Sequence, residues 1–419
     1  MGKILIVAHG TRGTFVPLLR LSRTLIRRGH HVTVSAAPNQ ARLAAEWALP
    51  FVGAGPDFGP ENLSAIFAKS AEAASKPATA LRAFAEHVLK PYFVPGARAL
   101  ATLASGFDGI LANGNAIWVK PVAEACRKPY ATIHLTILNF RSDWYSPVGA
   151  PVPESEMKSN RRAWDVSAQV NRRYLAAPMR ALYEELGFAA PEQLLAGDSI
   201  SPHLNLLPID PACAAPAPDW PRNLAQTGYF HAEPEELAAV PTAAREYVEA
   251  DRERPLIVFA FGSLGFRCAE SDYRALAAVA RRHGARVLAV TGWGEQACFD
   301  GAEAFSVASI SYDWLFPRAS LVVHHGGAGT TGECFRHAVP QAVAPQGFYD
   351  QFENAARVQA LGCGFQVAPG DLDPARFDEL LARALPQLPD LRRCAEKVRG
   401  QLQPDGREAC CAAIEQMIG

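Results

Sequence analysis

The sequence has little of what marks several large classes of protein. It lacks an excess of charge of either sign, since 41 lysines and arginines stand against 42 aspartates and glutamates. Nucleic-acid binding usually needs a concentrated basic surface, so this balance argues against a nucleic-acid partner. No stretch approaches the roughly 20 apolar residues of a membrane span. The opening apolar run, Ile4 to Ala8, is too short for a signal peptide. We expect a cytoplasmic protein, and a peripheral membrane contact stays compatible with the sequence.

The cysteines also exclude some kinds of site. All nine are scattered without the paired spacing of a zinc or redox site. Such scatter indicates small core residues in a reduced compartment. No Asp-x-Asp pair is placed like a metal site, so we expect no metal and no tightly bound cofactor.

The length and the order of the apolar segments predict two α/β domains. A chain of 419 residues, 49% hydrophobic and 20% charged, is too long for one ordinary core. A strand at Ile4–Ala8, a glycine-containing turn, an amphipathic run over 16–28 and a strand near 31–34 form the unit of a parallel sheet. The same rhythm restarts at 256–261, beyond a proline-rich passage. The predicted division is a first domain over 1–215, an interdomain region over 216–253 and a second domain over 254–419.

The most informative segment runs from Val322 to Thr331, where an apolar strand leads into His325, a glycine-rich turn, two threonines and a helix. Glycines let backbone N–H groups approach phosphate oxygens, and a helix N-terminus adds partial positive charge. Threonine hydroxyls and an imidazole N–H can donate further hydrogen bonds. No lysine follows the turn, so it is not a Walker A loop. The segment predicts a diphosphate site; the alternative is a glycine turn that caps an ordinary helix.

A second loop opens a helix about twenty residues later, at 345–355. Its adjacent carboxylate and carboxamide, Asp350 and Gln351, can bind neighbouring sugar hydroxyls. The alternative makes Asp350 a helix N-cap, with Glu353 completing a capping box. Both interpretations are compatible, because a cap residue at a loop mouth is still exposed to a ligand.

With these motifs the sequence resembles the bacterial members of glycosyltransferase family 1, which includes antibiotic, sterol and rhamnolipid glycosyltransferases. The motifs stand in the family's order across nearly the whole chain: Gly10-x-x-Gly13-x-x-x-Pro17, Phe261-Gly262-Ser263, Tyr312-Asp313-Trp314-Leu315-Phe316-Pro317, His325-Gly326-Gly327-Ala328-Gly329-Thr330, and Asp350-Gln351 followed by Asn354-Ala355. The resemblance implies a GT-B fold, in which two Rossmann-like α/β domains face each other across a cleft. It assigns the acceptor to the domain over 1–215 and a nucleotide-sugar donor to the domain over 254–419, which would include the C-terminal helices.

The resemblance also implies roles for single residues. Asp350 and Gln351 would hold the sugar, and the segment from Trp293 to Ile310 would border the nucleobase. The residues implied for the donor's diphosphate are His325, Gly327, Gly329, Thr330 and, from the opposite side, Ser263. Such folds need no metal, since the helix dipole, hydroxyls and imidazole offset the charge of the leaving diphosphate.

The general base is where this sequence departs from the family. An inverting transfer needs a base for the acceptor hydroxyl, and the family usually has histidine or aspartate directly after the second glycine of the N-terminal turn. That turn comprises Gly10, Gly13 and Thr14 here, and a threonine cannot act as a base near neutral pH. The candidates are His9, His134 and Asp143. Alternatively, an acidic acceptor or a reactive donor needs no strong base.

Aromatic residues of the first half, Phe140, Trp144 and Tyr145, are candidates for an acceptor pocket, since aromatic walls suit flat or apolar molecules. Core positions are the alternative. We therefore predict an inverting glycosyltransferase that moves a sugar from a UDP- or dTDP-sugar to a small hydrophobic acceptor, through oxygen, nitrogen or carbon. The alternatives are a nucleotide-sugar epimerase of the same fold and a non-catalytic relative. A dehydrogenase is disfavoured, because the N-terminal turn is not G-x-G-x-x-G and no acidic residue ends the second strand.

Overall fold

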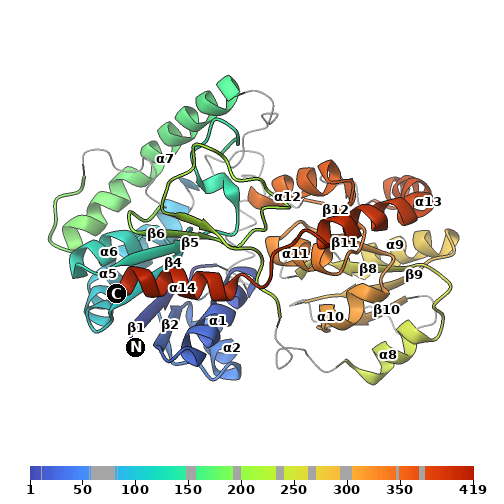
Figure 1. Cartoon of the computed structure of the whole chain (residues 1–419), viewed down its shortest axis with the longest axis horizontal. Coiled ribbons are helices and arrows are strands. Elements are labelled where there is room, and N and C mark those ends of the chain that lie inside the picture. The colour runs from blue at the N-terminus through green and yellow to red at the C-terminus, as the bar shows by residue number, and fades with distance from the viewer. Residues whose placement is uncertain are drawn as a thin grey trace. The chain divides into compact units, whose positions relative to one another are not determined.

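The chain forms two compact units, each built on a parallel sheet (Figure 1). The computed structural model describes residues 1–10, 12–55, 57, 81–82, 84–147, 157–191, 200–232, 240–262, 270–292, 304–345, 349–367 and 373–419. The first unit consists of Met1–Pro211, Ala215–Phe230 and Pro404–Gly419, and the second of Ala212–Ala214 and His231–Gln403.

The first unit has a seven-stranded sheet in the order β3-β2-β1-β4-β5-β6-β7. Its strands are β1 (Lys3–Val7), β2 (His31–Ala36), β3 (Phe51–Gly53), β4 (Gly109–Asn113), β5 (Tyr130–Ile133), β6 (Leu204–Leu207) and β7 (Leu224–Gln226). Strands β4, β5 and β6 are buried throughout, as expected when helices cover both faces of a parallel sheet. The strand order reverses direction between β1 and β4.

Helices flank this sheet because their apolar residues recur on one face. In the first helix Leu18, Leu21 and Leu25 lie one helical turn apart and pack against Ile4 and Ile6 of β1. The helical segments are α1 (Arg12–Arg27), η1 (Pro38–Gln40), α2 (Ala41–Glu46), η2 (Ala85–Phe93), α5 (Val94–Ser105), α6 (Val119–Cys126), η3 (Ile137–Asn139) and α7 (Met157–Glu185).

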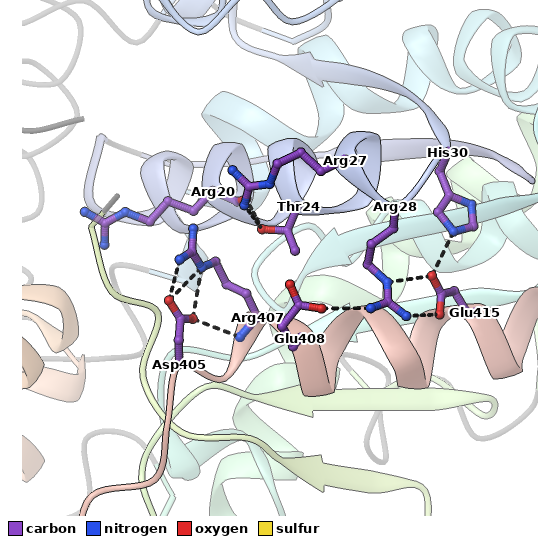
Figure 2. A network of polar contacts seen from close by, with 9 residues as sticks. All are labelled: Arg20, Thr24, Arg27, Arg28, His30, Asp405, Arg407, Glu408 and Glu415. Carbon is purple, nitrogen blue, oxygen red and sulfur yellow. Dashed lines mark hydrogen bonds and ion pairs between the residues drawn. The ribbon is translucent and has the colours of Figure 1, made fainter. Parts of the chain in front are cut away.

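The last helix of the chain, α14 (Arg407–Ile418), belongs to the first unit rather than to the second. Its Cys410, Cys411 and Ile414 join the same apolar core as β1 and α1. Figure 2 shows the polar side of the contact, where Glu415 binds Arg28 at 2.6 Å and His30 at 3.0 Å. The prediction that placed all of 254–419 in the second domain is therefore wrong for this helix.

The second unit has a six-stranded sheet in the order β10-β9-β8-β11-β12-β13. Its strands are β8 (Leu256–Ala260), β9 (Arg286–Val290), β10 (Ala304–Val307), β11 (Leu321–His324), β12 (Gln341–Val343) and β13 (Gly364–Gln366). Its helical segments are α8 (Thr242–Glu249), α9 (Glu270–Arg282), α10 (Tyr312–Leu315), η6 (Phe316–Arg318), α11 (Ala328–Arg336), α12 (Tyr349–Ala360) and α13 (Pro374–Arg399). The order reverses between β8 and β11, so both sheets share one topology.

Several predicted boundaries were wrong. The first helix begins at Arg12, which places Gly13 and Thr14 in its first turn rather than in a preceding loop. The region over 216–253, predicted as interdomain, contains β7 of the first sheet and α8 of the second unit. Strands β3 and β7 have three residues each, too few for a periodic pattern to reveal. Within the described residues, no helix combines the length and apolar character that crossing a bilayer requires.

Candidate active site

Ligands of open parallel sheets bind beyond the carboxyl ends of the strands, at the point where the strand order reverses. In the second unit this point lies between β8 and β11, which pair with His324 opposite Ala260. Gly262 follows β8 with a φ of +57°, and His325 follows β11. A Cβ at Gly262 would lie 3.4 Å from Cε1 of His325, so the two turns meet directly.

The two adjacent histidines differ in what they contact. His324 is fully buried, and its Nδ1 accepts the backbone N–H of Gly326 at 3.1 Å. The ring proton is therefore on Nε2, which donates to the side-chain oxygen of Gln341 at 3.0 Å. Both ring nitrogens are used inside the protein, and His324 serves to hold the turn. His325 instead folds over Gly327, where an added Cβ would lie 2.6 Å from its Nε2.

The protonation of His325 follows from its surroundings. Burial lowers the pKa of His325 to about 4, and the nearby carbonyl of Ala260 opposes this shift. The imidazole is therefore neutral near pH 7 and carries one N–H. Its Nδ1 has no hydrogen-bond partner of normal geometry among the described residues. An anionic ligand beside this ring would receive that N–H as a hydrogen bond.

Helix α12 is locked onto the same turn. Gly326 has a φ of +92°, and a Cβ there would lie 2.8 Å from the backbone oxygen of Gln351. The Asn354 amide donates to the Gly326 carbonyl at 2.8 Å, and Arg357 donates to Asn354 at 2.8 Å. Arg357 also pairs with Glu353. This close approach, which needs a glycine, brings the start of α12 beside the turn.

The N-cap residue of α11 offers no side chain to the backbone donors of the first turn. Gly327 is its N-cap and has no side chain to satisfy the following N–H groups. The N–H and hydroxyl of Thr331 both donate to the Gly327 carbonyl at 3.0 Å, so this threonine is committed to its own helix. Gly329 is exposed with no atom within 4 Å of an added Cβ, and Thr330 is half-buried. Of the two threonines, Thr330 remains for a ligand.

Asp350 lies against this helix start. The backbone N–H of Ala328 donates toward its carboxylate, while burial raises the pKa of Asp350 to about 6. Gln351 beside it is almost fully buried. Because α12 begins at Tyr349, Asp350 is not an N-cap, and Glu353 pairs with Arg357 instead of completing a capping box. The turn and the predicted sugar-binding pair are thus brought together within one unit.

The segment predicted to border the nucleobase is described in part. Ile310 is buried between β10 and α10. Gly292, two residues after β9, lies so close to Gly262 that an added Cβ would be 2.3 Å from the Gly262 carbonyl oxygen. Ser263 and Trp293, predicted to contact phosphate and base, directly follow these two glycines and lie outside the described residues.

The corresponding reversal point of the first sheet lies between β1 and β4, and it is occupied by His9 and Asn113. The side-chain oxygen of Asn113 accepts the backbone N–H of His9 at 2.7 Å, and the side-chain amide of Asn113 donates to the backbone carbonyl of His9 at 3.0 Å. This pair of bonds holds the backbone of His9 at the end of its strand. Burial lowers the pKa of His9 to about 3, so its imidazole is neutral near pH 7.

Three aromatic rings surround the His9 imidazole. Ring centroids lie 5.7 Å away for Phe84, 5.6 Å for Phe93 and 4.8 Å for Trp118. We call His9 and these three rings the His9 cage. Sequence reasoning missed the three rings, because they lie on segments that are remote in sequence and carry no shared motif.

The N-terminal turn is built around Thr14. Gly10 has a φ of +129°, and a Cβ there would lie 3.0 Å from the Thr14 hydroxyl oxygen. Gly13 and Thr14 belong to the first turn of α1, and Thr14 is half-buried. The threonine therefore packs against the loop that follows His9.

The other two candidate bases occupy different environments. His134 is buried, and its Nδ1 accepts from the Asn139 amide at 2.9 Å. Its Nε2 bonds the Thr132 hydroxyl at 2.9 Å, and that hydroxyl donates to Asn205 at 2.6 Å. A Cβ at Gly114 would lie 2.3 Å from its Nδ1, so no space remains for a substrate on that side. These contacts give His134 a structural role.

Asp143 is an ion-pair residue. The Arg161 guanidinium binds its carboxylate and lowers its pKa below the usual range. The Arg161 guanidinium therefore occupies the carboxylate oxygens that would have to receive a proton from the acceptor. Asp143 therefore stabilises the start of α7 instead of offering a basic group.

The predicted acceptor-pocket aromatics differ in exposure and in what they contact, although Phe140 and Tyr145 both pack against Trp220. Phe140 is fully buried and packs 4.7 Å from the His134 ring, so the structure gives it a core position instead of a pocket wall. Tyr145 stacks on Trp220 at 5.6 Å and donates its hydroxyl to the Ala215 carbonyl. Trp144 is 47% exposed.

One group of side chains among the described residues has the geometry of metal ligands. Asp313, Glu333 and His337 offer ligand atoms within 4.8 Å of one another. The Arg336 guanidinium, however, binds both carboxylates and supplies the positive charge that they need. This arrangement is complete as an ion-pair network around α11.

Known proteins match this chain along its whole length. A family model described as "Erythromycin biosynthesis protein CIII-like, C-terminal domain" matches residues 304–411. Glycosyltransferase GtfE of Amycolatopsis orientalis is 30% identical over 430 residues, which cover 100% of this chain and 98% of that relative. Vancomycin aglycone glucosyltransferase of the same organism is 31% identical over 429 residues, covering 96% and 95%. The solved structure of glycosyltransferase VinC in complex with dTDP matches with a TM-score of 0.69 at 19% identity, covering 99% of each chain.

Two parallel-sheet Rossmann-like units define the GT-B fold, which the VinC structure shares. The chain belongs to the glycosyltransferase family that includes GtfE and vancomycin aglycone glucosyltransferase. The predicted family, fold class and enzyme class are thereby confirmed.

Proposed function

We propose that this glycosyltransferase moves a sugar from a dTDP- or UDP-sugar to a hydroxyl of a small hydrophobic acceptor, with inversion at the anomeric carbon. The observation that carries the donor assignment is the junction of His325, the start of α11 and Asp350. Groups suited to a diphosphate and groups suited to sugar hydroxyls lie side by side there, at the reversal point of one sheet.

The diphosphate would lie over Gly329 and Thr330, beyond the Ala328 N–H that donates to Asp350, at a helix start whose N-cap Gly327 has no side chain. The His325 N–H would donate to a second oxygen. As the bond between the anomeric carbon and the diphosphate breaks, negative charge grows on the leaving oxygen, and these fixed donors stabilise it. Asp350 would accept hydrogen bonds from sugar hydroxyls next to the same helix start. No metal is required in this proposal.

The nucleotide is proposed from two sources. The family resemblance implies a UDP- or dTDP-sugar, and the structurally similar VinC was solved with dTDP. The backbone of Ile310 and the segment that begins at Trp293 are the proposed base contacts, and Ser263 is the proposed contact on the far side of the phosphates.

His9 is the proposed general base. Among the three candidates it lies at the carboxyl end of β1, at the reversal point where ligands of such sheets bind. His134 has both nitrogens hydrogen-bonded in the core, and Asp143 is bound to Arg161. In the reaction a His9 nitrogen takes the hydroxyl proton while the acceptor oxygen bonds the anomeric carbon. The diphosphate leaves from the opposite face, which inverts the configuration.

Two variants separate donor binding from proton transfer. The chain is incubated with dTDP-glucose or UDP-glucose and an acceptor panel, and glycoside formation is followed with nucleotide affinity by calorimetry. His325→Ala should lose both nucleotide binding and transfer, whereas His9→Gln should keep nucleotide binding and lose about 10²–10⁴-fold in kcat. His87→Gln, an exposed position, serves as the control. Full turnover in both active-site variants would reject the proposal.

The same assay addresses the two alternatives. An epimerase would convert the donor alone into a second nucleotide-sugar. The relatives described above give this alternative no support. A non-catalytic relative would bind nucleotide and transfer to none of the acceptors.

A further inference from the structure

We infer that a small phosphate monoester binds in a basic cavity at the edge of the first sheet opposite to His9. This inference goes beyond the proposed function and does not depend on it. The cavity has a volume of about 320 Å³ and lies between one face of α6 and the amino ends of β5 and β6. Its polar lining residues are Lys120, Glu124, Arg127, Lys128, Tyr130 and His203.

The cavity lies away from the edge of the sheet where the candidate base stands. Tyr130 begins β5 and His203 directly precedes β6, so the cavity is at the amino ends of these strands. His9 lies beyond the carboxyl end of β1, and β1, β4, β5 and β6 all pair in parallel. The length of the strands therefore separates the two places, and a ligand of the cavity is not the acceptor or the donor.

The cations of the cavity come from two parts of the chain. Lys120, Glu124 and Arg127 follow one another at intervals of four and three residues, so they lie on one face of α6. Cations after a helix C-terminus also offset the helix dipole, but that role explains neither Lys120 in the first turn nor His203 from the segment before β6. A concave site lined by cations concentrates anions.

The net charge of the lining matches a phosphate monoester. Three cations, Lys120, Arg127 and Lys128, stand against one carboxylate, that of Glu124, among the described residues that line the cavity. Two net positive charges therefore remain near pH 7. A phosphate monoester carries about −1.5 to −2 at this pH and has three strong acceptor oxygens. A carboxylate ligand has a single charge and would leave part of the positive charge unmatched.

The groups that would repel an anion are engaged by other donors. The Tyr183 hydroxyl donates to the Glu124 carboxylate at 2.9 Å. At the end of α6, the backbone carbonyl of Glu124 accepts the Arg127 N–H at 3.1 Å, and that of Ala123 accepts the Lys128 N–H at 3.0 Å. These carbonyls are therefore satisfied within the protein, and the long side chains of Arg127 and Lys128 face the cavity as donors.

The imidazole of His203 adds a donor to the lining. Its Nδ1 accepts the backbone N–H of Tyr130 at 3.4 Å, so the proton of the neutral ring is on Nε2. The size of the cavity completes the assignment. Pockets for small molecules span about 300–1,000 Å³, and this cavity is at the lower end of that range. It suits a ligand of the size of a phosphorylated monosaccharide.

Calorimetric titration with glucose 6-phosphate tests the site. We expect one ligand per chain and an affinity that falls as the salt concentration rises. Glucose, which lacks the phosphate, should not bind, and gluconate, with one negative charge on a similar carbon skeleton, should bind at least about tenfold more weakly. Vesicles of phosphatidylcholine and phosphatidic acid carry the same phosphate group on a bilayer and should not sediment the protein.

Arg127→Gly removes one cation without straining the fold. Arg127 has a φ of +53°, in the left-handed region that favours glycine, so the melting temperature should stay the same or rise. The Kd for glucose 6-phosphate should increase about tenfold or more, as for the loss of a hydrogen bond to a charged group. Glu124→Gln keeps an oxygen for Tyr183 and should tighten binding about two- to fivefold. Arg162→Gln, at an exposed position of α7, is the matched control and should leave the Kd unchanged.

His325→Ala places the ligand in the cavity rather than in the proposed donor site, because it should leave the Kd for glucose 6-phosphate unchanged. The absence of binding at millimolar glucose 6-phosphate, or an unchanged Kd in Arg127→Gly, would overturn the inference. Equal affinity for gluconate, loss of binding in His325→Ala, or binding to the vesicles without binding of glucose 6-phosphate would also overturn it. The proposed function stands or falls separately, on nucleotide binding and sugar transfer.

Discussion

Replacing Gly329 by alanine should make the second unit more stable and the enzyme a poorer binder of nucleotide. Gly329 is the second residue of α11, its φ is negative, and no atom lies within 4 Å of an added Cβ. Alanine fits this backbone without strain and restricts the unfolded chain, which stabilises the folded state by about 0.4–1 kcal/mol. For a unit of this size the melting temperature should rise by about 1–4 °C.

The affinity of Gly329→Ala for nucleotide should fall although its stability rises. If the diphosphate lies over the first turn of α11, the new methyl group occupies space that a phosphate oxygen needs. Loss of one hydrogen bond to a charged group costs about 1.5–3 kcal/mol. That cost corresponds to roughly a 10- to 150-fold increase in the Kd for dTDP or UDP.

The assay measures both quantities on the same preparations, with thermal unfolding for stability and titration calorimetry for nucleotide. Gly96→Ala is the matched control, because Gly96 lies in the first turn of α5 in the first unit and also has open space around it. It should gain similar stability and keep nucleotide affinity. Gly327→Ala is the contrasting variant, since its Cβ would displace His325 and should lower both affinity and stability.

The combination of higher stability and weaker binding cannot come from misfolding, which would lower both. Wild-type affinity for both nucleotides in Gly329→Ala would show that no phosphate oxygen lies over this turn, and the donor assignment would then be refuted. A loss of stability in this variant would contradict the packing described for the helix start.

Three further predictions concern charge and position. Burial raises the pKa of Asp350 to about 6, so its carboxylate protonates as the pH falls through that value. Below about pH 6, kcat/KM should therefore drop about tenfold per pH unit. In a pH–rate profile of Asp350→Asn, this acidic decrease should be absent. Asn113→Ala should release the His9 backbone, which should lower kcat by about 10- to 100-fold and leave nucleotide affinity unchanged. Asn113→Asp keeps the oxygen that accepts the His9 backbone N–H, so it should recover part of the rate. Arg28 and His30 lower the pKa of Glu415 to about 2, so its stabilisation is complete above 4.5 and is lost as the pH falls from there toward 2. After allowance for solvent screening, Glu415→Gln should lower the free energy of unfolding by about 1–2 kcal/mol at pH 7, measured by urea denaturation. It should also make the free energy of unfolding depend less on pH in the acid range. Equal stability of variant and wild type at pH 7 would refute a role for this ion pair.

Figure 2 shows why this last prediction concerns the first unit although Glu415 stands near the end of the chain. Helix α14 presents Glu415 and Glu408 to the same guanidinium, that of Arg28. A close approach of backbones precedes the helix, where a Cβ at Gly406 would lie 2.3 Å from the carbonyl oxygen of Gly228. The final helix is therefore held by packing, by charge and by a glycine contact that no larger residue allows.

The sequence by itself determined which residues are the candidates for donor binding. The strand, the glycine turn and the helix start around His325 are consecutive in the chain, so their chemistry is visible in a stretch of ten residues. Asp350 and Gln351 are likewise adjacent. Local sequence also predicts alternating strands and helices, because buried parallel strands are continuous apolar runs and helices carry a 3.6-residue period.

Only the tertiary structure decided the surroundings of His9 and the limits of the units. The sequence offered His9 as a candidate, but the rings around it, Phe84, Phe93 and Trp118, come from separate segments and cannot be told from ordinary core residues. The same holds for His134, whose hydrogen bonds to Thr132 and Asn139 reveal a structural histidine. The return of α14 to the first sheet depends on apolar packing between residues about 400 positions apart. The periodic apolar residues of a helix indicate that one of its faces is buried, but they do not specify the element against which that face packs.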